Sequence, residues 1–382
     1  MKVLIVTHHY LHGVGGGVFA SRAYINAIAE IADSVTLMYP YKMNYDAEDI
    51  SAKIKKIPVE YNKPQIIKAL DVIRGKSHRY YSVFDTVLSS DNYDLVVFDN
   101  SKASFKLIDR AHRYGAKVVT IHHNCELEYN RDNCIGVLRP FVMFWTRKYE
   151  CEAIQKSDLS LTLTKQDKKL LADIYNNSIT NNIEVIGVFE YKRRKDYINN
   201  VNKGYHGRDI KFIITGTLNS VQTENSLLPW LRTYYPILKD VIPNSNLLIA
   251  GKSPSTKIQE ACKLLNIELV PSPQSMQPFL DEADVYICPT ALGGGLKLRI
   301  MDGLKNGLPI LTHSVSARGY DPFGELGFLF QYNDEITFRK AVVKIASSSF
   351  DKQAIMQTYK NIFSFDSGLD TMKDLLMKYE IV

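Results

Sequence analysis

The sequence has few of the features that mark membrane, disulfide-rich or nucleic-acid-binding proteins. No apolar stretch approaches the roughly 18–20 residues that a membrane-spanning helix needs. Five cysteines, an odd number without paired spacing, indicate a reducing compartment rather than a disulfide framework. A net charge of +6 over 382 residues is modest, so it argues against nucleic acid as a partner but allows an anionic ligand. With 45% hydrophobic and 23% charged residues, we predict an ordinary globular protein of the cytoplasm.

The sequence also offers little to a metal ion. Cys125, Cys134 and Cys151 lie near His122 and His123, but these spacings match no zinc module. No Asp-x-Asp element is placed to hold a divalent cation. We therefore expect no metal site and no separate cofactor.

What the chain does contain is two series of alternating strands and helices, because 382 residues are too many for one core. The predicted strands are Lys2–Thr7, Ser34–Met38, Asp94–Phe98, Ala116–Ile121, Leu159–Leu163, and then Lys211–Thr215, Asn246–Ala250, Glu268–Val270, Asp284–Cys288 and Pro309–Thr312. Short apolar runs separated by helical patterns predict parallel sheets with crossover helices. The predicted class is α/β, with two Rossmann-like doubly wound domains, residues 1–190 and 206–364, facing a cleft. The polar, basic stretch Glu190–Gly207 is the predicted linker.

A glycine-rich corner lies between Pro289 and Pro309. The strand Asp284–Cys288 runs into three consecutive glycines, and a helix is expected directly after them. Such a corner points unpaired backbone N–H groups outward, which suits phosphate oxygens. Lys297 and Arg299 are predicted in the first helical turn, where cations are unfavourable unless an anion is bound. The alternative is that both face solvent and that Arg299 pairs with Asp302 at i, i+3.

A second glycine run, Gly15 to Gly17, follows the first strand, and the next helix is predicted over Ser21–Ile31. This run either approaches the phosphates of a bound ligand or lines a groove for a second substrate, or it is a flexible connection without a ligand. Glu126 is equally open: it either orders the loop around His123 or is a solvated acid.

The second half of the chain resembles the retaining GT-B glycosyltransferases, in particular their family-4 (group 1) clan. The resemblance covers nearly the whole second domain. It is carried by Lys211–Gly216, Leu248–Gly251, Ala283–Pro289, the triple glycine and Gly307–Ile310. In the first half, His123-Asn124-Cys125-Glu126 is similar to a His-Asn-x-Glu segment of the clan.

The resemblance implies a role for each matching residue. His123, Lys297 and Arg299 would be catalytic. The donor-binding residues would be Gly16, Gly17, Gly216, Lys252, Gly293, Gly294, Gly295, Leu296 and Asp302. Two glutamates are common around this loop in the clan. The first corresponds to Gly294, so its carboxylate is missing here, and the second corresponds to Asp302, whose side chain is shorter. The stretch Thr217–Asn225 lacks the usual Arg and Lys, so neutralisation of the diphosphate would rest on Lys297 and Arg299, with Lys252 as a helper.

The implied activity is transfer of a sugar from a nucleoside diphosphate sugar, in the UDP or GDP form, to a glycan or lipid-linked acceptor with retention, in cell-surface polysaccharide or glycoconjugate synthesis. A nucleotide-sugar epimerase and a non-catalytic nucleotide-binding homologue are the alternatives. Two segments rich in basic and aromatic residues, Lys63–Tyr81 and Leu138–Tyr149, either contact the inner membrane face peripherally or pack in the core with solvated cations.

The last predicted helix has an apolar face of its own. Its apolar residues recur at helical spacing: Phe365, Leu369, Met372, Leu375, Leu376 and Tyr379. In proteins that resemble this one, the last helix often returns to the first domain. We therefore expect residues 365–382 to join that domain.

Overall fold

The computed structural model describes residues 1–13, 15–42, 46–60, 64–74, 79–134, 136–175, 182–193, 209–293 and 295–382. The chain divides into two compact units. Unit 1 comprises Met1–Arg194 and Phe363–Val382, and unit 2 comprises Lys195–Ile362. Most of the predicted linker, residues 194–207, lies outside the described residues. Among the residues described, no helix has both the length and the apolar character needed to cross a membrane.

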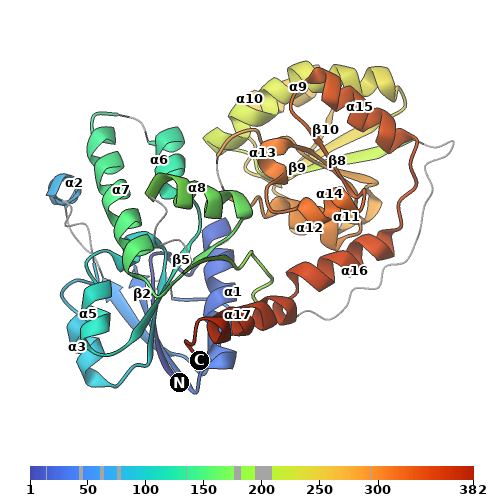
Figure 1. Cartoon of the computed structure of the whole chain (residues 1–382). Coiled ribbons are helices and arrows are strands. Elements are labelled where there is room, and N and C mark those ends of the chain that lie inside the picture. Colours follow the sequence, from blue (N-terminus) through green and yellow to red (C-terminus); the bar gives the residue numbers. More distant parts are fainter. Residues whose placement is uncertain are drawn as a thin grey trace. The chain divides into compact units, whose positions relative to one another are not determined.

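Unit 1 is built on a seven-stranded parallel sheet with the order β3-β2-β1-β4-β5-β6-β7 (Figure 1). The strands are β1 (Lys2–Thr7), β2 (Ser34–Tyr41), β3 (Lys55–Glu60), β4 (Leu95–Asp99), β5 (Lys117–His122), β6 (Leu159–Thr162) and β7 (Ile183–Val185). The chain lays down β1 to β3 in one direction and then places β4 on the other side of β1. The carboxyl ends of β1 and β4 therefore form the switch point at which such sheets bind ligands.

The helices of unit 1 are α1 (Gly16–Ile31), α2 (Gln65–Arg74), α3 (Phe84–Ser90), α4 (Ser101–Ser104), α5 (Ile108–Arg113), α6 (Glu126–Asn133), α7 (Arg139–Lys156), α8 (Lys165–Tyr175) and α17 (Phe365–Lys378). Helix α1 begins earlier than predicted, with Gly15 as its N-cap. Gly16 and Gly17 thus belong to the first helical turn and not to a flexible loop. The central strands are fully buried, since helices cover both faces of the sheet.

Helix α17 packs against α1 in unit 1. Its buried face consists of Phe365, Gly368, Leu369, Met372 and Leu376. The ring of Phe189 contacts that of Phe365 and also that of Tyr24 of α1. At the surface, the guanidinium of Arg193 bridges Glu30 of α1 and Asp366 of α17, each at 2.7 Å.

Unit 2 contains a six-stranded parallel sheet with the order β10-β9-β8-β11-β12-β13. Its strands are β8 (Lys211–Thr217), β9 (Asn246–Lys252), β10 (Glu268–Pro271), β11 (Val285–Cys288), β12 (Ile310–His313) and β13 (Leu329–Tyr332). Its helices are α9 (Val221–Val241), α10 (Thr256–Leu264), α11 (Gln277–Glu282), α12 (Arg299–Lys305), α13 (Ser314–Ala317), α14 (Asp321–Glu325), α15 (Glu335–Ala346) and α16 (Lys352–Phe363). Here the switch point lies between β8 and β11.

The two parallel sheets confirm the predicted α/β class, and each of the ten predicted strands is present with ends shifted by a few residues. Three strands were missed: β3, β7 and β13. All three lie at the edge of a sheet, where one side needs no partner. Edge strands tolerate charge and proline, as in the Lys-Lys-Ile-Pro-Val-Glu of β3, so they lack the continuous apolar run of a central strand.

Candidate functional site

In unit 2, the switch point brings Arg299 beside the end of β8. Gly216 has a φ of +145°, a conformation that side-chain-bearing residues rarely adopt. A Cβ at Gly216 would lie 2.9 Å from the guanidinium carbon of Arg299. Glycine is therefore required here for its backbone conformation and also for the space that Arg299 occupies.

Lys297 lies on the glycine-rich loop that follows β11. Gly293 and Gly295 have φ angles of +81° and +67°. The ammonium of Lys297 lies 3.3 Å from the position that a Cβ on Gly293 would take. The hydroxyl of buried Tyr320 donates to the carbonyl of Lys297 at 2.9 Å. The side-chain amide of Gln222 donates to the carbonyl of Leu292 at 2.6 Å. These two hydrogen bonds hold the backbone of the loop on both sides of the glycines.

The position of Lys297 relative to the following helix differs from the prediction. Helix α12 begins at Arg299 with Leu298 as N-cap, so Lys297 precedes the helix and is not in its first turn. The carbonyl of Lys297 accepts from the N–H of Ile300 at 3.0 Å and from the hydroxyl of Tyr320, so Lys297 lies in the turn that leads into the helix. Leu296 is half-buried, and Gly294 lies outside the described residues.

Asp302 pairs with Lys305 rather than with Arg299. Arg299 makes no ion pair with any residue that the structure describes. Both cations at this corner therefore lie next to glycines, and Arg299 is not neutralised by a described carboxylate. The alternative in which Arg299 and Asp302 pair is not observed.

Lys252 ends β9, the neighbour of β8, and its side chain is exposed. It is opposite Thr217 in the sheet register, and its carbonyl accepts from the N–H of Leu218 at 2.9 Å. Lys252, Gly216 and Arg299 thus share the carboxyl edge of this sheet.

In unit 1, three polar side chains meet at the carboxyl ends of β1, β4 and β5. Nε2 of His123 bonds to Oδ1 of Asp99 at 2.5 Å, and Thr7 donates its hydroxyl proton to Oδ2 of Asp99 at 2.5 Å. Both Asp99 and His123 are buried. Burial alone would raise the pKa of Asp99, but the charge and hydrogen bond of His123 outweigh it and hold that pKa below its usual range. Asp99 is thus an ionised anchor for the His123 ring.

His9 lies against His123, with ring centroids 4.8 Å apart. A Cβ at Gly17 would come within 2.5 Å of Cε1 of His9, so Gly17 makes room for this ring. Burial, followed by the proximity of His123, lowers the pKa of His9 to about 4. The sequence prediction missed both His9 and Asp99. The only available signal was that these polar residues stand at, or just after, the carboxyl ends of the apolar strands β1 and β4.

Glu126, which begins α6 beside His123, is part of an ordered hydrogen-bond network. The amide of Asn100 donates to Glu126 at 3.1 Å. Buried Glu150 accepts from the backbone N–H groups of Glu126 and Leu127 at 2.6 and 3.1 Å, so it caps α6. Glu126 thus has a described partner, Asn100, while the start of the helix is ordered by Glu150; that Glu126 itself orders the loop around His123 stays a prediction.

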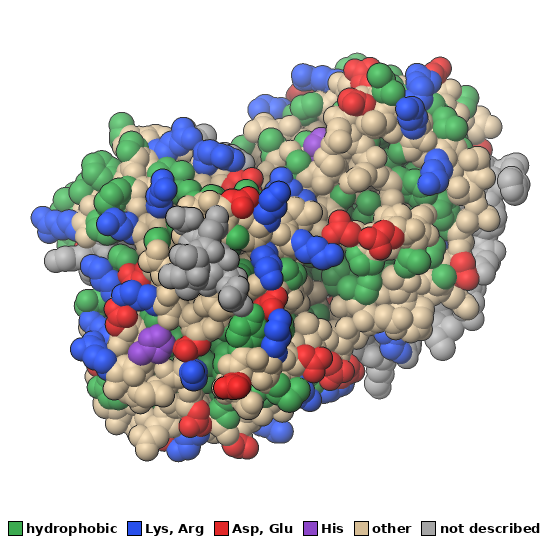
Figure 2. Space-filling model, in the orientation of Figure 1, with side chains coloured by type: hydrophobic (Ala, Val, Ile, Leu, Met, Phe, Trp, Pro, Cys, Tyr) green, Lys and Arg blue, Asp and Glu red, His purple; other side chains and the backbone are tan. Residues whose placement is uncertain are grey.

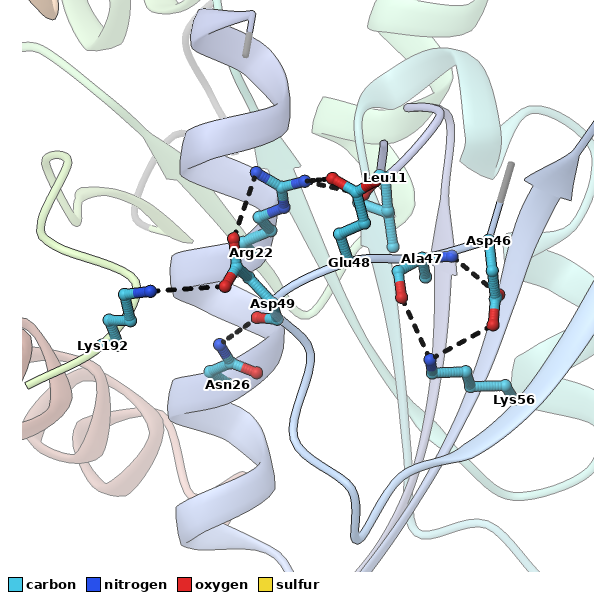
Figure 3. Close-up of polar contacts among 9 residues, drawn as sticks. All are labelled: Leu11, Arg22, Asn26, Asp46, Ala47, Glu48, Asp49, Lys56 and Lys192. Atoms are coloured by element: carbon cyan, nitrogen blue, oxygen red, sulfur yellow. Dashed lines mark hydrogen bonds and ion pairs between the residues drawn. The ribbon is translucent and has the colours of Figure 1, made fainter. Parts of the chain in front are cut away.

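The loop after β1 is held by Arg22 of α1 (Figure 3). The buried guanidinium donates to the carbonyl of Leu11 at 2.9 Å and reaches Glu48 at 3.4 Å and Asp49 at 3.8 Å. Asp49 in turn pairs with Lys192 at 3.3 Å. Arg22 thus fixes the segment that carries His9 and joins it to the chain after β2.

His122 differs from its neighbour because it is a strand residue buried on the opposite side of the chain. Burial lowers its pKa to about 3, and both of its ring nitrogens lack a hydrogen-bond partner among the described residues. The pKa of His122 is lower in the folded state than in the unfolded state, where it is near 6.5. Its contribution to stability is therefore fully present above pH 6.5 and is lost as the pH falls toward the folded-state pKa. We expect His122→Leu to flatten the fall in melting temperature between pH 6.5 and 4. An unchanged pH profile would contradict this assignment.

Comparison with known proteins finds similarity to one family in the second unit. Residues 209–348 match the family model described as "Glycosyl transferases group 1". A curated relative, "Uncharacterized 44.6 kDa protein in cps region" of Klebsiella pneumoniae, is 25% identical over 169 residues. That match covers 42% of this chain and 42% of the relative, so it spans less than half of either protein.

Solved structures match over almost the whole chain at low identity. The "lipopolysaccharide outer core galactosyltransferase WaaB apo form" is 12% identical with a TM-score of 0.65, covering 99% of both chains. The "pneumococcal O-GlcNAc transferase GtfA in complex with UDP and GlcNAc" is 12% identical with a TM-score of 0.63, covering 100% of this chain and 99% of that one. Residues 209–348 are therefore similar to a group 1 glycosyltransferase domain, and the chain has the fold of the GT-B glycosyltransferases.

Proposed function

We propose that this protein is a retaining glycosyltransferase that transfers a hexose-type sugar from a nucleoside diphosphate sugar to a glycan or lipid-linked acceptor. The observation that carries the proposal is the placement of Lys297 and Arg299 at the switch point of unit 2, each against a glycine. The names of the relatives, a protein of a cps region and a lipopolysaccharide galactosyltransferase, support a role in polysaccharide or glycoconjugate synthesis.

The proposed chemistry follows from the leaving group. As the glycosidic bond breaks, negative charge grows on the diphosphate, and fixed cations stabilise that charge more than they stabilise the ground state. Gly216 and Gly293 leave room for these two cations, because a side chain at Gly216 would overlap the guanidinium of Arg299 and one at Gly293 would crowd the ammonium of Lys297. We assign neutralisation to Lys297 and Arg299, with Lys252 as an accessory cation and no metal ion or other cofactor. Asp302, if released by Lys305, is the proposed partner of the donor ribose.

His123 is proposed to contact the transferred sugar near the reacting carbon. Asp99 would act as a positioning residue, since its ionised carboxylate fixes the ring through Nε2. Gly16, which is exposed at the start of α1, and Gly17, whose lack of a side chain admits His9, are the other donor-binding residues proposed in unit 1.

The nucleotide is the first property to test. The solved relative with bound UDP favours a uridine donor, with GDP as the alternative. We expect millimolar UDP to raise the melting temperature by about 5 °C, as binding at a large excess over Kd should for a unit of this size. UMP, which lacks the second phosphate, should give a smaller rise. If neither UDP nor GDP shifts the melting curve, the proposed donor site is wrong.

Product analysis then distinguishes the remaining enzyme classes. Protein-dependent release of free nucleoside diphosphate from a nucleotide sugar supports a transferase and excludes a non-catalytic homologue. Conversion of the nucleotide sugar to an isomer without any acceptor would instead identify an epimerase.

A further inference from the structure

Helix α2 turns its apolar side to solvent. Ile66, Ile67, Leu70 and Ile73 are all exposed, Ile66 to 77%, whereas Asp71 on the same helix is buried. A helix on a globular domain normally does the reverse, with an apolar stripe inward and charges outward. Exposed apolar side chains that cluster in this way mark a surface that binds something.

The start of α7 repeats this pattern. Val137, Phe141 and Phe144 are exposed, Val137 to 92%. Their spacing of i, i+4 and i+7 equals that of Ile66, Leu70 and Ile73. The two helices pack together, and the indole N–H of Trp145 donates to the carbonyl of Ile73 at 3.1 Å. We call the joint surface of residues 64–74 and 136–149 the α2–α7 face.

The charges of the α2–α7 face have one sign. The exposed charged residues are all basic: Lys68, Arg74, Arg139, Arg147 and Lys148. The one acidic residue in the two segments is Asp71, which is buried. The ammonium of Lys148 lies 5.4 Å from the ring centroid of Phe144. Figure 2 shows hydrophobic side chains with Lys and Arg around them at the end of unit 1 where α2 and α7 lie.

We propose that the α2–α7 face docks on the surface of an anionic lipid bilayer. Apolar side chains flanked by cations are the combination that binds an interface, because the former enter the acyl boundary while the latter attract anionic headgroups. A second copy of the chain fits less well, since a symmetric dimer would set the same five cations against one another. The inference rests on unit 1 alone and does not depend on the proposed enzymatic activity.

The test uses the full chain and lipid vesicles. We expect it to co-sediment with vesicles of phosphatidylcholine and phosphatidylglycerol at least about tenfold more tightly than with phosphatidylcholine alone, and less as salt increases. Equal binding to both vesicle types, or none to the anionic vesicles at low salt, would overturn the proposal.

Two paired variants separate the apolar and the electrostatic contributions. Ile66→Gln with Phe144→Gln should weaken binding to anionic vesicles by about tenfold or more, because both side chains would enter the acyl boundary. Arg147→Gln with Lys148→Gln should weaken it by about 20-fold and reduce its salt dependence. The four positions are exposed, so the fold should tolerate these changes.

Matched controls lie on α15 of unit 2, where exposed residues of the same types occur. Ile336→Gln with Val343→Gln, and Lys340→Gln with Lys344→Gln, should bind vesicles as the unmodified chain does. An equal loss in these controls would contradict the proposal. The unmodified chain could instead form a concentration-dependent dimer and not bind vesicles. If the Ile66→Gln, Phe144→Gln variant abolishes that dimer, the α2–α7 face is an interface with a second copy of the chain. The UDP-dependent melting shift should persist in that variant, so failure of one proposal is distinguishable from failure of the other.

Discussion

Replacing Lys297 or Arg299 by alanine is expected to remove most of the affinity of this protein for a nucleoside diphosphate. A charge-assisted hydrogen bond to a phosphate contributes about 1.5–3 kcal/mol, so each change should raise the Kd for UDP by roughly 10- to 150-fold. The melting shift with UDP should shrink accordingly. Arg299→Lys should lose less than Arg299→Ala, because it keeps the charge but not the planar fork that binds two oxygens at once.

Titration calorimetry with UDP, and separately with UMP, measures this effect. Because both cations are assigned to the diphosphate, the alanine variants should bind UDP little better than UMP. Lys263→Ala, an exposed cation at the end of α10, is the matched control and should bind UDP normally. Full UDP affinity in both alanine variants would show that the phosphates are held elsewhere.

Gly368→Ala should destabilise unit 1 strongly. Gly368 is on the buried face of α17, and a Cβ there would overlap Cγ of the Phe189 ring. Phe189 cannot move aside easily, because it is buried and its ring contacts those of Tyr24 and Phe365. Overpacking of this kind lowers the free energy of unfolding by about 1–3 kcal/mol, and we expect a value at the upper end. Urea denaturation measures the loss as a lower midpoint concentration of urea.

A control and a rescue make this prediction specific. Gly324→Ala on helix α14 would place its Cβ in open space and should leave stability unchanged or slightly higher. Phe189→Leu combined with Gly368→Ala should recover part of the loss, so the two changes should be non-additive. Equal stability of Gly368→Ala and the unmodified chain would mean that α17 does not pack as described.

The features that could be predicted best are those formed by residues that are close together in the sequence. The central strands could be predicted because each is a continuous apolar run, and the corner containing Lys297 and Arg299 is contiguous in sequence. The Asp99–His123 pair could not be predicted, since its members are 24 residues apart and meet only because β4 and β5 are adjacent. The same holds for the space at Gly17 that His9 fills.

The basic and aromatic segments show another limit. Sequence left open whether they face a membrane or the core, and the structure divides them. Tyr80 and Tyr149 are buried, whereas Phe141, Phe144 and four residues of α2 are exposed: Ile66, Ile67, Leu70 and Ile73. Composition cannot make this division, because it depends on which side of each helix the rest of unit 1 covers.

The path of the chain through α17 has a consequence for biosynthesis. The N–H of Glu190, where the chain leaves unit 1, donates to the carbonyl of Phe363, where it returns, at 2.8 Å. The partner of α1 thus follows unit 2 in the sequence and emerges from the ribosome only after all of residues 195–362. During translation, unit 2 can fold while the part of α1 that contacts α17 is still uncovered. The unit that begins first is therefore completed last, and nascent chains stalled within unit 2 would present α1 to chaperones.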